Sequence, residues 1–114
     1  MSDCLFCKIG SGQIPAKVVL QDDEVLAFDD INPQAPVHVL VIPKRHVVAL
    51  NEAGAGDQAL LGHLLEAAAL VARKKGLADA GYRVVVNQGR DGGQTVFHLH
   101  LHVLGGRHMA WPPG

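Results

Sequence analysis

The strictest constraint on the fold is a segment in which histidine alternates with aliphatic residues, His98-Leu99-His100-Leu101-His102-Val103-Leu104. A period of two residues indicates a β-strand, because successive side chains of a strand point to opposite faces. We therefore predict a strand over Val96–Leu104 that places all three imidazoles on one face, roughly 6 to 7 Å apart at the backbone. The aliphatic residues between them would enter the core from the other face.

The remainder of the chain combines short strand-forming segments with one long helix-forming segment. Runs of β-branched and aromatic residues, separated by turn residues, predict strands over Val18–Leu20, Val25–Phe28, Val37–Ile42 and Tyr82–Asn87. Leucine and alanine recur at helical spacing from Asp57 onward, and this helix is expected to end at Arg73–Gly76. A short helical turn is expected over Cys4–Ser11.

This order of elements indicates an α+β domain, in which helices cover one face of an antiparallel sheet. We expect five strands, one long helix and one short helix. The glycine-rich segment Gly89–Thr95 would join the last two strands as a hairpin. A length of 114 residues is that of one ordinary domain, so we expect a single domain over residues 1–114.

Charge and hydropathy narrow the classes of partner. The formal net charge is -1, which creates no general field for attracting DNA, RNA or an anionic membrane. The sequence shows neither the pattern of a secretory signal nor an apolar stretch of membrane-spanning length. We therefore expect a cytoplasmic protein without nucleic-acid or membrane partners, in which any phosphate is bound by local groups.

The row of histidines suits nucleophilic and acid–base chemistry on phosphate. An unperturbed imidazole titrates at about 6.5, and its free ring nitrogen can form a covalent phosphoramidate. The preceding Gly92-Gly93-Gln94-Thr95 offers backbone amides and a hydroxyl that could form an anion-binding loop. Two other interpretations stay open at this point: an exposed strand face that happens to carry histidine, and a metal site shared by histidines two residues apart.

The sequence also resembles the histidine-triad superfamily, and in particular its Hint branch, whose signature is His-x-His-x-His followed by two hydrophobic residues. The resemblance extends over nearly the whole chain. It rests on Leu5-Phe6, Ile14-Pro15-Ala16-Lys17, Asp30-Ile31, Pro33-Gln34-Ala35-Pro36, Val41-Ile42-Pro43-Lys44, Gly92-Gly93-Gln94, the triad, Gly105-Gly106-Arg107 and the final Trp111-Pro112-Pro113-Gly114. It implies the family's α+β fold in a two-fold homodimer, with the long helix at the interface.

The resemblance implies a purine nucleoside phosphoramidase, which forms a nucleotidyl-histidine and releases a nucleoside monophosphate such as AMP. His100 would be the nucleophile, His102 would bind the phosphate and assist departure of the leaving group, and His38 would buttress the nucleophile. Groups expected at the phosphate or the leaving group are Asn87, Gly93, Gln94 and Thr95, where threonine replaces the more usual serine. Asp30 would bind the ribose hydroxyls.

The purine would be enclosed by Leu5, Phe6, Ile9, Phe28, Asp29 and Ile31. Histidine is often found in the family at the position of Asp29, so this residue bears on base preference. From residue type alone, Phe6, Phe28 and Ile31 could equally be ordinary core.

Cys4 and Cys7 form a C-x-x-C pair near the amino terminus, which indicates metal or redox chemistry in a reducing compartment. The resemblance to bacterial members of the superfamily implies that His46 and His98 complete a structural zinc site with them. Catalysis itself would require no cofactor. Reduced thiols and a redox pair are the alternatives for these cysteines.

Two further functions compete with the enzyme. The triad could hold AMP without turnover, as a nucleotide sensor, or the chain could be a zinc-binding interaction protein. The sensor predicts affinity for AMP without a phosphohistidine intermediate. The metal protein predicts that chelation abolishes its main activity.

Overall fold

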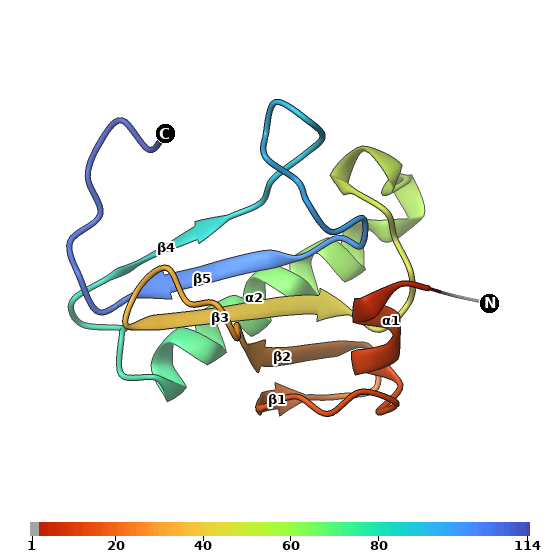
Figure 1. Cartoon of the computed structure of the whole chain (residues 1–114), viewed down its shortest axis with the longest axis horizontal. Helices are drawn as coiled ribbons and strands as arrows, with labels where there is room; N and C mark the ends of the chain where they lie inside the picture. The colour runs from red at the N-terminus through yellow and green to blue at the C-terminus, as the bar shows by residue number, and fades with distance from the viewer. Residues whose placement is uncertain (1–2) are drawn as a thin grey trace.

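A computed structural model describes residues 3–114 and contains one antiparallel sheet between two helical layers (Figure 1). The strands are β1 (Val18–Gln21), β2 (Val25–Asp29), β3 (Val37–Pro43), β4 (Tyr82–Val85) and β5 (Leu101–Gly105). Their order across the sheet is β1-β2-β3-β5-β4, and every neighbouring pair is antiparallel. The prediction of a five-stranded α+β fold is confirmed.

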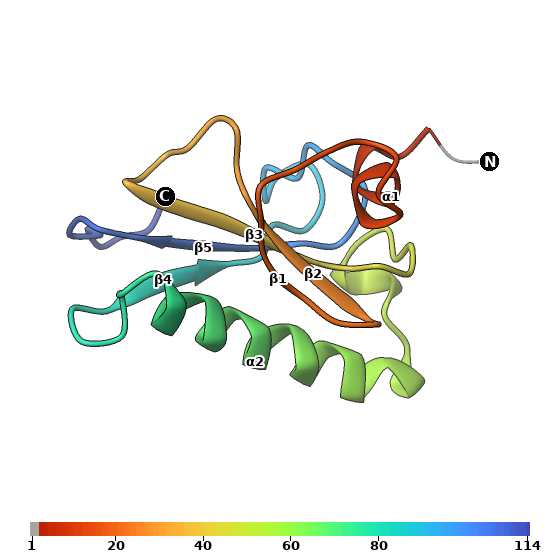
Figure 2. The ribbon, with the colours of Figure 1, turned by 90° about the horizontal axis from the view of Figure 1, so that it is seen from below.

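The two faces of the sheet pack against different helices. Helix α2 (Gln58–Lys74) covers the face formed by side chains such as Val39, Val41 and Val103. The opposite face holds a smaller cluster, in which Phe6 of helix α1 (Leu5–Gly10) packs with Phe28 and other apolar residues. The prediction that the helices cover one face is therefore wrong for α1, which lies across the sheet from α2 (Figure 2).

Helix α2 forms and ends for local reasons that the sequence shows. Its buried side chains recur at helical spacing and make one apolar stripe: Leu60, Leu64, Ala67, Ala68, Val71 and Ala72. Past its carboxyl end, Gly76 has a φ of 75°, which a residue with a β-carbon rarely adopts. The Leu77 N–H then donates to the Ala72 carbonyl at 2.8 Å, which closes the helix with a Schellman bond.

Two single-turn 3-10 helices, Leu50–Glu52 and Ala55–Asp57, connect β3 to α2. Within residues 3–114, each helix is too short or too polar to cross a membrane.

The last two strands are shorter than predicted. β4 ends at Val85 rather than Asn87, and β5 begins at Leu101 rather than Val96, so the expected antiparallel hairpin forms with a longer loop than Gly89–Thr95. The chain before β5 is held by bonds to the segment after β3, because His98 Nε2 lies 2.7 Å from the Pro43 carbonyl oxygen and the Leu99 N–H donates to Val47. Only His102 of the three histidines thus lies in the regular strand.

A histidine on α2 connects this helix to the β1–β2 turn. His63 Nδ1 lies 2.6 Å from the Glu24 carboxylate and His63 Nε2 lies 2.7 Å from the Asp22 carboxylate. Hydrogen bonding to Glu24, reinforced by Asp22, raises the pKa of His63 above its ordinary value of 6.5. The protonated ring therefore stabilises the fold below about pH 6.5, and this contribution is lost as the pH rises through the raised pKa.

We predict that His63→Gln destabilises the protein more at about pH 6 than at about pH 8.5. Because all three side chains are partly exposed, solvent screening should limit the difference to a few tenths up to about 1 kcal/mol. Urea unfolding of both proteins at the two pH values measures it. An equal loss of unfolding free energy at both values would contradict the proposed charge on His63.

Candidate functional site

Three imidazoles meet on the sheet face that carries α1. His38 comes from β3, His102 from the neighbouring β5, and His100 from the residues just before β5. The ring centroids of His38 and His102 are 5.1 Å apart, and those of His100 and His102 are 5.0 Å apart. His98 is directed elsewhere, so the predicted row of three imidazoles on one strand face is corrected to a group of two triad histidines and His38.

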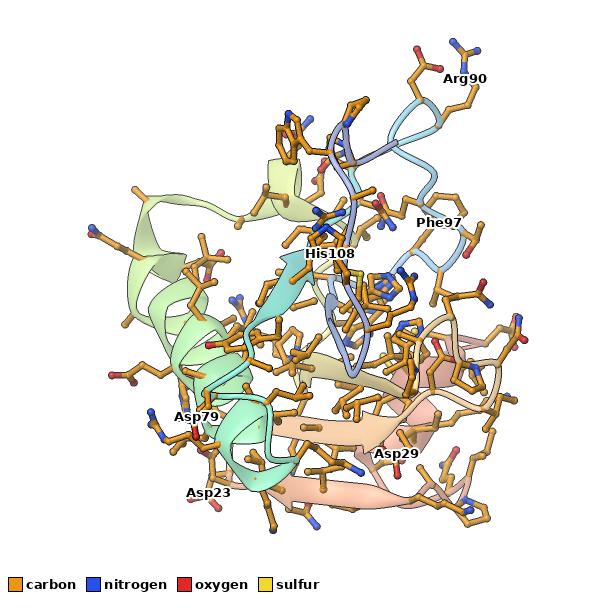
Figure 3. The ribbon with its side chains drawn as sticks, turned by 90° about the vertical axis from the view of Figure 1, so that its left-hand side faces the viewer. Asp23, Asp29, Asp79, Arg90, Phe97 and His108 are labelled. Atoms are coloured by element: carbon orange, nitrogen blue, oxygen red, sulfur yellow. The ribbon has the colours of Figure 1, made fainter. Side chains whose placement is uncertain are left out.

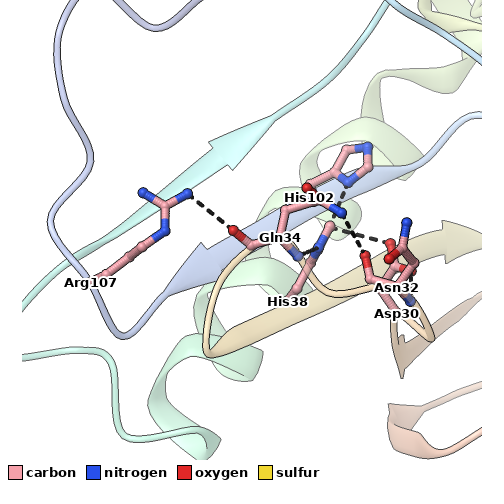
Figure 4. Close-up of polar contacts among 6 residues, drawn as sticks. All are labelled: Asp30, Asn32, Gln34, His38, His102 and Arg107. Carbon is pink, nitrogen blue, oxygen red and sulfur yellow. Dashed lines mark hydrogen bonds and ion pairs between the residues drawn. The ribbon is translucent and has the colours of Figure 1, made fainter.

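A backbone amide sets the tautomers of His38 and His102 (Figure 4). The Gln34 N–H donates to His38 Nδ1 at 3.0 Å, so the ring proton of His38 must lie on Nε2. That nitrogen is 2.9 Å from His102 Nδ1, which must accept, so His102 in turn carries its proton on Nε2. The carbonyl of Gln34 accepts from Arg107, which ties the same loop to the segment after β5.

His102 Nε2 is a buried donor without an acceptor among residues 3–114. Burial, together with the neighbouring His100 and His38, lowers the pKa of His102 to about 4. The ring is therefore neutral near pH 7. Since an unsatisfied buried donor costs on the order of 1 to 3 kcal/mol, a ligand oxygen that accepts from Nε2 would bind favourably.

A backbone carbonyl sets the opposite tautomer of His100. Its Nδ1 lies 2.7 Å from the carbonyl oxygen of His98, which can only accept, so the ring proton lies on Nδ1. His100 Nε2 then keeps its lone pair and can act as a nucleophile. A nucleophilic nitrogen and a hydrogen-bond donor thus lie side by side on one sheet face.

Beside these rings, the predicted purine-enclosing residues differ in exposure. Leu5 is 46% exposed and Ile31 is 100% exposed, as expected for side chains that a ligand would cover. Phe6 and Phe28 are buried and pack edge to face, while Ile9 is half-buried against the same cluster. Leu5 and Ile31 are therefore accessible for contact with a purine base, and Phe6 and Phe28 form the floor beneath them.

The two aspartates after Phe28 have different charged partners. Asp30 Oδ2 lies 3.4 Å from His38 Nε2, and both residues line a hollow of about 210 Å³ that could accept a ribose. The carboxylate of Asp29 instead pairs with Lys75 at 3.0 Å, beyond the carboxyl end of α2. Figure 3 labels Asp29 at the end of β2. Asp29 also lines the hollow beside Asp30 and His38, so its contact with the purine stays a prediction.

The glycine-rich loop uses much of its polar surface internally. The side chain of Gln94 is buried, donates to the Val48 and Val96 carbonyls, and accepts from the Gly89 N–H. Its own N–H donates to Gly89, and the N–H of Gly93 donates to Arg90. We therefore interpret Gln94 as shaping the loop.

Two predicted phosphate-contacting residues flank this loop in accessible positions. Thr95 is exposed, and Asn87 is half-buried before the loop begins. Their side chains therefore stay candidates for contact with a phosphate or a leaving group.

Cys4, Cys7, His46 and His98 converge at the amino end of α1, with their donor atoms all within 4.8 Å of one another. His98 Nδ1 lies 3.3 Å from Cys4 Sγ, 3.5 Å from Cys7 Sγ and 3.2 Å from His46 Nδ1. Because His98 Nε2 donates to the Pro43 carbonyl, His98 Nδ1 carries a lone pair. Two sulfurs and two imidazoles with a carbonyl partner behind one of them fit a tetrahedral zinc ion.

Sequence reasoning missed two main-chain groups that organise these sites, the Gln34 amide and the Pro43 carbonyl. Both occur in segments that the resemblance includes, yet side-chain patterns carry no signal for a backbone hydrogen bond. Their role follows only from the geometry.

We predict that His102 stays neutral in the folded protein until the pH approaches about 4. A histidine in water would protonate near 6.5, but burial beside two other imidazoles disfavours the charged ring. A ¹⁵N NMR titration of the ring, assigned with His102→Gln, measures the midpoint. A midpoint at the ordinary value would show that the ring is solvated and that the chain of tautomers is wrong.

Comparisons with known proteins agree with this geometry. A family model described as the HIT domain matches residues 11–109. An uncharacterized HIT-like protein of Synechococcus elongatus is 57% identical over 112 residues, which cover 98% of this chain and 97% of that protein. A HIT-like protein of Synechocystis is 56% identical over the same shares of the two chains.

Solved structures show the same similarity. The HIT family hydrolase from Legionella pneumophila superposes with a TM-score of 0.96 at 53% identity, covering 98% of this chain and 100% of that one. A histidine triad protein from Clostridium difficile has a TM-score of 0.93 at 44% identity, with 96% of each chain covered. The sequence match and the shared fold show that this chain belongs to the HIT domain family.

Proposed function

We propose that this protein is a nucleotide-binding hydrolase of the Hint type, which cleaves purine nucleoside 5'-phosphoramidates through a nucleotidyl-histidine. The proposal rests on the opposite tautomers that the hydrogen bonds imply: His100 Nε2 has a lone pair, and His102 Nε2 carries a proton that meets no acceptor among residues 3–114. A phosphoryl group between them would meet a nucleophile and a donor together. The hydrolase named among the solved structures supports the same reaction class.

In the first step, the lone pair of His100 Nε2 attacks the α-phosphorus, and the bond from phosphorus to the leaving nitrogen breaks. The departing amine takes up a proton from the solvent, and the exposed Thr95 hydroxyl is accessible for hydrogen bonding to it. The His102 Nε2–H donates to a phosphoryl oxygen as negative charge develops there. His38 keeps His102 in the donating tautomer.

In the second step, water attacks the phosphorus and releases a proton to the solvent, and the bond between phosphorus and His100 breaks. The products are a nucleoside 5'-monophosphate and the original imidazole, so the enzyme is restored. Asp30 would accept hydrogen bonds from the ribose hydroxyls, and Leu5 and Ile31 would cover the base. The chemistry is carried by side chains and needs no bound cofactor.

We predict that His100→Ala lowers the hydrolysis of adenosine 5'-phosphoramidate by on the order of 10⁴-fold or more, because the covalent route is lost. His108→Ala is the matched control, since His108 is exposed and lies beyond β5. Release of AMP gives the rate. Rapid acid-free quenching and mass spectrometry of the peptide that holds His100 detect the intermediate.

The rival functions give different results in the same assay. Binding of AMP without turnover on several leaving groups would contradict the enzyme and favour a nucleotide sensor. Turnover that survives in His100→Ala would contradict its role as nucleophile.

We also propose that the chain forms a two-fold homodimer through α2 and the edge strand β4. His63 and Lys74 of α2 contact the β1–β2 turn and β1, so they mark the flank of the helix that faces β1. Helical geometry places Leu65 on the other flank, toward β4, with 59% of its surface exposed. An exposed leucine beside an edge strand is a surface that a second copy would cover.

We predict that Leu65→Asp converts the dimer to a monomer, because a charge would be buried at the interface. Leu70→Asp is the matched control, since Leu70 is 49% exposed on the flank that faces β1. Sedimentation velocity measures both proteins. A dimer that dissociates only in the Leu70→Asp variant, or in neither variant, would contradict this interface.

A zinc ion held by Cys4, Cys7, His46 and His98 is part of the same proposal, on the fit of the donor atoms described above. It would join α1 to the loop before β5. A cytoplasmic location, where the two thiols stay reduced, is consistent with this role.

A further inference from the structure

The residue that closes the Cys/His cluster is also the residue that orients the candidate nucleophile. The His98 side chain faces Cys4, Cys7 and His46, and it is fully buried. The carbonyl of the same residue accepts the Nδ1–H of His100 at 2.7 Å. Any rotation of the His98 backbone that follows loss of its side-chain contacts would therefore break the bond that fixes the His100 tautomer.

A second connection runs through Phe6, which lies between the two cysteines in sequence. Its ring meets the His100 ring edge to face, with centroids 5.1 Å apart and an interplanar angle of 89°. The centroid of the Phe6 ring also lies 5.9 Å from that of His98, and the Phe6 side chain is buried, with 4% exposed. Phe6 thus occupies the space into which the His100 ring would otherwise turn.

The position of Phe6 depends in turn on the cluster. Helix α1 has only six residues, far fewer than the roughly 12 to 15 that an isolated helix needs for stability in water. Its first turn is built on Cys4, whose sulfur accepts the Cys7 N–H at 3.4 Å, while Cys7 Sγ lies 3.2 Å from His46. The contacts of the two cysteines with the cluster therefore hold α1 against the sheet.

We propose that the Cys4–Cys7–His46–His98 cluster positions His100, through the His98 carbonyl and the Phe6 ring, so that a metal in the cluster sets the rate of the nucleophile. The metal takes no part in bond making. Phe6 is a positioning residue in this scheme, in addition to lying beneath the base. The inference rests on the proposed role of His100, and it adds that emptying the cluster slows turnover without removing the nucleotide site.

The test compares the His100 ring in four samples of ¹⁵N-histidine-labelled full-length protein. They are the wild type with zinc, the wild type stripped by a chelator, Phe6→Leu with zinc, and Phe97→Leu with zinc. Phe97 is the matched control, because it is a phenylalanine on the same loop as His98 whose ring is 61% exposed (Figure 3). Circular dichroism checks that each sample is folded, and long-range ¹H–¹⁵N spectra report the tautomer.

With zinc, the wild type and Phe97→Leu should show His100 protonated on Nδ1 alone. The stripped protein and Phe6→Leu should show a mixture of tautomers, and their single-turnover rates on adenosine 5'-phosphoramidate should fall about 10-fold to 100-fold, as for other supporting residues of a site. AMP affinity should change less than the rate in the stripped protein, because the cluster acts on His100 rather than on the base or ribose.

A stripped, folded protein that keeps the Nδ1–H tautomer and the full rate would overturn the coupling. If stripping has the expected effect and Phe6→Leu has none, the Phe6 connection is overturned and the His98 carbonyl alone carries the coupling. If the wild type with zinc shows no turnover, the proposed hydrolase activity is contradicted. The tautomer spectra alone then decide whether the cluster positions His100. If the stripped protein unfolds, a folded variant that lacks the exposed cluster residue, His46→Asn, takes its place, and an unchanged His100 tautomer and rate in that variant would overturn the coupling.

Discussion

The site depends on two backbone hydrogen bonds that assign opposite tautomers to neighbouring histidines. The His98 carbonyl can only accept, so His100 must donate from Nδ1 and keep a lone pair on Nε2. The Gln34 amide can only donate, so it fixes His38 and, through His38, leaves His102 with a proton on Nε2. Main-chain groups do not titrate near neutral pH, so this arrangement is stable where a side-chain partner would change its charge.

The fold brings these backbone groups to the right places. β3 and β5 are neighbours, which sets His38 beside His102, and α2 covers the opposite face, so the histidine face is left to α1 and a ligand. The loop before β5 leaves the ladder and bonds to the segment after β3, which turns the His98 side chain toward the cysteines and its carbonyl toward His100. The irregular backbone before β5 therefore positions His98 for both the Cys/His cluster and the His100 ring.

Periodicity in the sequence predicted the long helix well, because its burial repeats at helical spacing. The central strands were predicted from β-branched and aromatic residues between turns, since β2 and β3 are buried on both faces and show no alternation. The ends of β4 and β5 could not be predicted, since a bond from His98 to a carbonyl 55 residues earlier competes with strand pairing and leaves no local pattern. The cluster of Cys4 with His98 likewise joins residues 94 positions apart and was expected only from resemblance. The ion pair of Asp29 with Lys75 was within reach of sequence reasoning, because alternation along β2 places Asp29 with Val25 and Ala27, on the face of α2.

The most direct test of this account is neutron diffraction from crystals of the deuterium-exchanged protein at neutral pH, because it locates the ring protons of His38, His100 and His102. The account predicts density on Nδ1 of His100, directed at the His98 carbonyl, and on Nε2 of both His38 and His102. Density on Nε2 of His100, or on Nδ1 of His102, would contradict it, since the nucleophilic lone pair or the donor to phosphate would then be lost.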